Sequence, residues 1–138
     1  MMRSGRAEVQ EFNADELMYR RYIQEDFDGE SLKPARFPFP PSLNRQRFSE
    51  PADVVFSETG DFDEHGVLEC TVEHLSPRIQ EHQFVPVHRP EEDNYSHSEM
   101  WAEHVQTKLR TELPSKAVRK MYRTKVSQLF KVRIAAKR

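Results

Sequence analysis

The sequence GVLECTVE at residues 66–73 constrains the fold of this chain more than any other feature. Apolar side chains alternate with polar or charged ones along this run, which places Leu68, Cys70 and Val72 on one face. That period of two is typical of a β-strand with one buried face. Such a strand needs partner strands beside it and a second layer over its apolar face. The run therefore predicts a sheet.

Two other segments have the composition of strands. Residues 53–57 are rich in valine, and we expect them to pair antiparallel with the 66–73 run across a polar loop. Residues 84–88 form a third extended segment. We expect this segment at an edge of the sheet, because Pro86 cannot donate a hydrogen bond to a neighbouring strand.

Capping signals predict helices towards both ends of the chain. An asparagine and a serine are each followed three residues later by glutamate, which predicts helices over 14–24 and 97–112. Pro114 then separates a last helix, expected over 116–135, with apolar side chains at helical spacing. The expected fold class is α+β, with a small antiparallel sheet of three or four strands, a short N-terminal helix and two C-terminal helices.

The chain is expected to form one domain over residues 12–138, with a basic helical region at 105–138. The preceding residues, 1–11, have few apolar groups and are expected to be disordered. Prolines exclude a helix from the PARFPFPP segment, where Phe37 and Phe39 are expected to pack on the domain itself.

Several classes of function lack their sequence signals. The chain has four glycines and none of the glycine-rich patterns that bind nucleotide phosphates. A single cysteine, Cys70, excludes an internal disulfide and a zinc site built on several thiolates. No run approaches the roughly 18 consecutive apolar residues of a membrane span. We therefore expect a cytoplasmic protein without a cofactor, a bound metal or a membrane partner.

The formal net charge of -2 conceals a division between the two parts of the chain. Residues 105–138 contain eleven Lys or Arg and one acidic residue, Glu112, whereas residues 1–104 contain ten basic and twenty-two acidic residues. This asymmetry predicts either a surface that binds a polyanion or pairing between the basic region and the acidic body. The residues expected to bind are Lys116, Arg119, Lys120, Arg123, Lys125, Lys131 and Arg133.

The leading hypothesis is a small non-enzymatic binding or adaptor protein that uses this basic surface. Nucleic acid and a protein partner, including a second copy of the chain, are about equally expected as the ligand. No zinc finger, aromatic RNA-binding run or helix-turn-helix pattern accompanies the charges. The sequence therefore does not choose between RNA, DNA and an acidic protein face.

An alternative hypothesis is a hydrolase or nuclease centred on residues 88–99. All six histidines fall between positions 65 and 104, and His88 and His97 flank an acidic loop with Glu99 close behind. On this alternative the two histidines would act as acid and base. A structural interpretation, in which Ser96 and Glu99 cap a helix, accounts for much of the same segment and is favoured. The polar segment 42–51 suits either the lining of a site or a surface loop.

Overall fold

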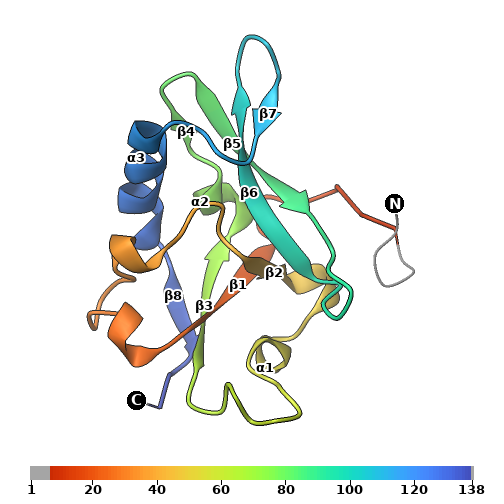
Figure 1. Ribbon diagram of the computed structural model, residues 1–138, viewed down its shortest axis with the longest axis vertical. Coiled ribbons are helices and arrows are strands. Elements are labelled where there is room, and N and C mark those ends of the chain that lie inside the picture. The colour runs from red at the N-terminus through yellow and green to blue at the C-terminus, as the bar shows by residue number, and fades with distance from the viewer. Residues whose placement is uncertain (1–6, 138) are drawn as a thin grey trace.

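The computed structural model describes residues 7–137, and its centre is one eight-stranded antiparallel sheet (Figure 1). The strands are β1 (Leu17–Tyr22), β2 (Leu43–Arg45), β3 (Gly66–Thr71), β4 (Arg78–Ile79), β5 (His82–His88), β6 (His97–His104), β7 (Arg110–Thr111) and β8 (Lys131–Ile134). Their order across the sheet is β4-β5-β6-β2-β1-β3-β8, and β7 pairs with β6.

Six short or medium helices connect these strands. The α-helices are α1 (Pro51–Val54), α2 (Val72–Leu75) and α3 (Lys116–Ser127), and the 3-10 helices are η1 (Gln24–Asp26), η2 (Pro34–Arg36) and η3 (Gln46–Phe48). Only α3 exceeds one turn, so the sheet provides most of the regular structure in the described part of the chain.

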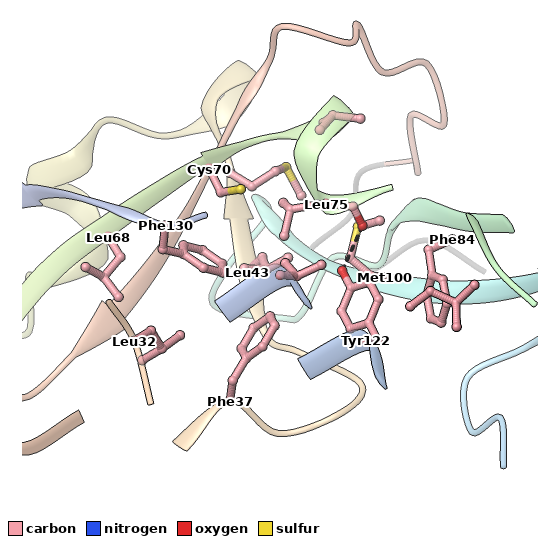
Figure 2. Packing of buried hydrophobic residues seen from close by; sticks show 14 of the residues in the cluster. Leu32, Phe37, Leu43, Leu68, Cys70, Leu75, Phe84, Met100, Tyr122 and Phe130 are labelled. Carbon is pink, nitrogen blue, oxygen red and sulfur yellow. Dashed lines mark hydrogen bonds between the residues drawn. The ribbon is translucent and has the colours of Figure 1, made fainter. Parts of the chain in front are cut away.

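The main hydrophobic core lies between α3 and one face of the sheet (Figure 2). Tyr122 of α3 is fully buried, stacks on Phe84 of β5 with 4.2 Å between ring centroids, and donates a hydrogen bond of 2.8 Å to the Leu75 carbonyl. Phe37 from the proline-rich segment is also fully buried and packs edge-on against Phe130. The expectation that this segment packs on its own body is confirmed.

A smaller cluster lies on the opposite face of the sheet. Tyr19 of β1 and Val67 of β3 are buried there beneath Val54 of α1. Residues 49–65 run across this face at the lower end of the molecule, where α1 lies beside β1 (Figure 1). The sheet therefore has α3 on one face and this connection over part of the other.

The expected fold class is wrong in the size of the sheet and in the number of helices. Residues 17–22, expected in an N-terminal helix, form β1, because Leu17 and Tyr19 face one side of the sheet and Met18 the other. Glu16, expected to complete a helical capping box, instead accepts two hydrogen bonds from Arg45. Because Glu16 forms this ion pair with Arg45, its side chain is not available to cap a helix.

The expected helix over 97–112 is also wrong. Residues 97–104 form β6, in which buried Ser98, Met100 and Ala102 alternate with partly exposed side chains. That period of two places a strand here, and the predicted cap residue Ser96 hydrogen-bonds to asparagine side chains instead. Only one of the two expected C-terminal helices is present, because β6 and β7 replace the first and β8 replaces the end of the second.

Residues 53–57 do not form the expected strand, because Pro51 begins the short helix α1 there. The strand predicted at 66–73 is confirmed over Gly66–Thr71, but it pairs with β1 and β8. The extended segment at 84–88 is confirmed within β5, but the expected edge position is wrong, because β5 lies between β4 and β6. Pro86 pairs on one side with β6, while β4 reaches only as far as Gln83 on the other, so the proline lies where no second strand needs its N–H.

Candidate functional site

The predicted cationic residues lie on α3 and on the edge strand β8, but the two sets do not share a face of the sheet. The side chains of Lys116, Lys120 and Lys125 are exposed on α3, and those of Arg119 and Arg123 are partly exposed. Val118, Tyr122 and Val126 recur at four-residue intervals on the buried face of the helix, which leaves the cations on its outer faces. Lys131 and Arg133 follow on the exposed strand β8. Lys131 pairs with Glu69, which pairs with Tyr19, so the β8 cations point away from the face that α3 covers. We call the cations of both elements together the α3–β8 surface.

None of the five cations on α3 forms an ion pair with a carboxylate among residues 7–137. Arg119 donates a hydrogen bond of 2.6 Å to the Pro114 carbonyl, which is uncharged. On β8, the Nε of Arg133 lies 3.8 Å from a Glu69 carboxylate oxygen, with the arginine side chain 57% exposed. The positive charges of α3 are therefore not neutralised by direct contact with carboxylates of the described residues.

A groove separates α3 from the edge strand β4. Its volume is about 580 Å³, and Met121 and Ile79 supply apolar side chains to its lining. Met121 is 44% exposed, so its apolar side chain is accessible from the groove. Arg78, Lys120 and Lys125 also line the groove, so it combines an apolar strip with positive charge.

The structure places His88 in a buried packing role. Its Nδ1 accepts a hydrogen bond of 2.9 Å from the Val9 N–H, and its Nε2 lies 2.6 Å from the Tyr95 carbonyl oxygen. The ring also stacks on Phe48 at 5.2 Å between centroids. These contacts require a neutral ring with the proton on Nε2. Burial accordingly lowers the pKa of His88 below its usual value.

His88 does not lie with the other two residues of the predicted catalytic group. It pairs with Ser98 across the sheet, so it shares a face with Ser98, whereas His97 and Glu99 point to the opposite face. The Nδ1 of His97 lies 2.9 Å from the Arg89 carbonyl, and its Nε2 lies 3.0 Å from the Ser42 hydroxyl. The sheet thus separates His88 from His97 and Glu99.

Glu99 is held by its own neighbours. Its Oε1 accepts a hydrogen bond of 2.9 Å from the Trp101 indole and lies 3.3 Å from an Arg89 nitrogen. Arg89 also bonds to Glu112 at 2.8 Å, and this hydrogen bond is the main reason why the pKa of Arg89 is raised. The carboxylate is therefore already engaged by donors of the protein.

Residues 9–11, part of the segment expected to be disordered, contact the body of the domain. The fully buried Arg45 guanidinium donates hydrogen bonds of 2.6 Å to the carbonyls of Val9 and Glu11. The same guanidinium binds both carboxylate oxygens of Glu16, at 2.9 and 2.8 Å. Residues 1–6 lie outside the described residues.

A polar cleft on the face opposite α3 contains residues that sequence reasoning did not assign to a site. It consists of two hollows of about 500 and 350 Å³, which share Arg21, Asn44, Glu91 and Asn94 in their linings. His97 lines the smaller hollow. The polar composition of 42–51 was the available signal. No sequence pattern indicated Arg21, because its place in the cleft depends on strand β1, which was not predicted.

Two further features bear on chemistry. In the part of the chain that the structure describes, no three His, Cys, Asp or Glu side chains are grouped so that they could hold a metal ion. Burial raises the pKa of the Cys70 thiol to about 12, which disfavours the reactive thiolate.

Among residues 7–137, no helix is both long and apolar enough to cross a membrane.

Comparisons with models of protein families, with curated proteins and with solved structures find no match to this chain. The functional argument therefore depends on the geometry alone.

Proposed function

We propose that this chain is a binding protein whose α3–β8 surface contacts the phosphate backbone of a nucleic acid. The observation that carries the proposal is the absence of any carboxylate paired with the α3 cations among residues 7–137. The acidic body could have neutralised this helix, but none of its carboxylates among residues 7–104 forms an ion pair with an α3 cation. An external polyanion is then the natural counter-charge.

The composition of this region supports the same ligand. Residues 113–137 contain eight Lys or Arg and no Asp or Glu, and they form one helix followed by one exposed strand. Lys116 and Lys120 are one helical turn apart, so their charges fall along one side of the helix. Cations spaced in this way neutralise successive phosphates without reading bases, because phosphate contacts position a protein and carry no sequence information.

A charge-reversal experiment tests the proposal. Lys120→Glu with Arg123→Glu should weaken binding to labelled single-stranded and duplex oligonucleotides by about tenfold or more, because it removes two phosphate contacts and adds repulsion. Fluorescence anisotropy measures the affinity, and thermal unfolding checks that the domain remains folded.

Arg47→Glu with Lys108→Glu is the matched control, since it makes the same charge change at exposed positions outside α3 and β8. Equal weakening by both variants would contradict a specific role for the α3–β8 surface, because it would show an effect of net charge alone.

An acidic protein segment is a second candidate ligand, favoured by the groove beside α3. The apolar strip of Met121 and Ile79 gives such a segment a place for an apolar anchor, which a phosphate backbone does not need. The hydrolase alternative has less support, because His88 and the pair His97 and Glu99 lie on opposite faces of the sheet.

A further inference from the structure

The polar cleft opposite α3 has two ends of different chemistry. The larger hollow is lined by three phenylalanines, Phe48, Phe56 and Phe62, and the smaller by Arg20 and His97. Arg21 and Asn44 belong to both linings, so the two hollows adjoin. Their volumes of about 500 and 350 Å³ fall within the range of small-molecule sites.

The cationic end contains one guanidinium group without a carboxylate partner, that of Arg21, while Glu91 also lines both hollows and one of its carboxylate oxygens lies 3.8 Å from the His97 Nε2. Arg21 forms no ion pair within the described part of the chain. Arg20 lies on the other face of β1, where it donates hydrogen bonds to the carbonyls of Ser42 and Arg36. Arg21 is fixed in place, because it stacks over the Phe62 ring at 3.6 Å and donates one hydrogen bond to the Val54 carbonyl. Its remaining N–H groups have no acceptor among residues 7–137. Burial lowers the pKa of Arg21, as expected for a guanidinium that lacks a counter-charge.

An amide network presents a further donor between the two ends. The Oδ1 of Asn44 accepts a hydrogen bond of 2.7 Å from the Asn94 amide and lies 2.9 Å from the Ser96 hydroxyl. Asn44 is thereby held with its oxygen occupied. Its own NH₂ group has no partner in the described structure, so both of its protons are left for a ligand.

The aromatic end offers an exposed ring. Phe56 is 70% exposed, although it lines the cleft and follows directly after the short helix α1. A single exposed phenylalanine needs no explanation by itself. Here it stands over a hollow that also contains two more phenylalanines and a fixed arginine, and planar rings bind such surfaces by stacking.

We propose that this cleft binds a nucleoside monophosphate. The base stacks on Phe56 in the larger hollow, and the phosphate binds Arg21 and accepts a hydrogen bond from the Asn44 NH₂ group. Asp93, which is exposed and lines the same hollow, accepts hydrogen bonds from the ribose hydroxyls. This site is separate from the cations of α3, because α3 covers the other face of the sheet.

Binding of AMP, GMP, CMP and UMP to the full chain, followed by calorimetry and by amide NMR shifts, tests the proposal. At least one of the four should bind with a dissociation constant below about 1 mM, and more tightly than the same nucleoside or inorganic phosphate alone. Arg21→Gln should abolish the difference in affinity between the nucleotide and the same nucleoside without phosphate. Phe56→Ala should weaken the nucleotide by about fivefold or more, and it removes no buried contact.

Arg123→Gln is the matched control, since it removes one arginine from α3 instead of the cleft. It should leave mononucleotide binding unchanged while it weakens oligonucleotide binding, and Arg21→Gln should show the reverse pattern. The proposal is overturned if none of the four nucleotides binds, or if Phe56→Ala and Arg21→Gln both bind as tightly as the wild type. Shifts confined to α3 on nucleotide addition would also overturn it, and would leave the proposed function intact.

Discussion

Arg45 of β2 holds the N-terminal segment, residues 9–16, against the sheet. Its guanidinium is fully buried, lies 3.7 Å from the centroid of the Phe12 ring, and binds the carbonyls of Val9 and Glu11 as well as the Glu16 carboxylate. Four of the donors on its planar fork are thus used. A lysine at this position could not make the same two-pronged contact with Glu16.

Replacement of Arg45 by methionine should therefore destabilise the domain strongly. The variant leaves Glu16, which is only 9% exposed, without its counter-charge, and loss of one partner of a buried pair costs about 3–5 kcal/mol. Urea denaturation measures the difference in the free energy of unfolding. Arg47→Met is the control, because Arg47 is exposed on the same segment and should change stability by less than about 0.5 kcal/mol. Similar losses for both variants would contradict this role of the buried pair.

His88 predicts a dependence of stability on pH. In the folded state its pKa is lowered by burial, and the ordinary value of 6.5 applies after unfolding. Below pH 6.5 the unfolded chain therefore takes up a proton that the folded state resists, so this contribution to stability is lost as the pH falls. His88→Gln should lose less stability than the wild type between about pH 7 and about pH 5.

Denaturation with urea at several pH values measures this difference. His74→Gln is a suitable control, because the His74 side chain is exposed and its loss should leave the wild-type pH dependence in place. Parallel curves for His88→Gln and the wild type would show that His88 does not contribute to the acid sensitivity.

At the scale of secondary-structure elements, local signals correctly predicted the strand at 66–71 and the start of α3, and they failed where tertiary contacts engaged the residues that were expected to cap helices. The strand at 66–71 and the start of α3 at Lys116 followed from alternation and from a serine after Pro114. The helix start read at Glu16 was wrong, because Glu16 binds an arginine 29 residues away. No local pattern contains that partner.

The candidate sites were predictable to different extents for the same reason. The cations of α3 could be identified from composition, since exposure on a helix with one apolar stripe follows from sequence. The polar cleft could not, because Arg21, Asn44 and Asn94 come from three separate segments and meet only through the order of β1, β2 and β6.

Gly66 determines how closely β8 approaches β3. A Cβ atom at this position would lie 2.4 Å from the Ile134 carbonyl oxygen and 2.5 Å from a Tyr22 ring carbon. Gly66→Ala should therefore displace β8 from the sheet edge and destabilise the domain by about 1–3 kcal/mol. Hydrogen exchange at the amides of Lys131–Ile134 should become faster than in the wild type. Unchanged protection of these amides would contradict the close packing at Gly66.

At the scale of the whole molecule, the basic and acidic residues of the chain occupy different parts of the fold. The basic residues 113–137 form the outer helix and an edge strand, whereas several carboxylates on the sheet and loops pair with arginines and histidines outside α3, such as Arg45, Arg89, Arg110 and His104. The net charge of -2 therefore gives no measure of the local field at α3. A polyanion approaching α3 meets a positive surface despite the acidic total.

The salt dependence of oligonucleotide binding tests this central claim most directly. If the α3–β8 surface neutralises phosphates, the logarithm of the association constant for duplex DNA should fall linearly with the logarithm of salt concentration, by about 0.9 for each phosphate contacted. Lys120→Glu with Arg123→Glu should reduce that slope by about two or more. Binding that does not weaken with salt, or a slope that the double variant leaves unchanged, would contradict the claim.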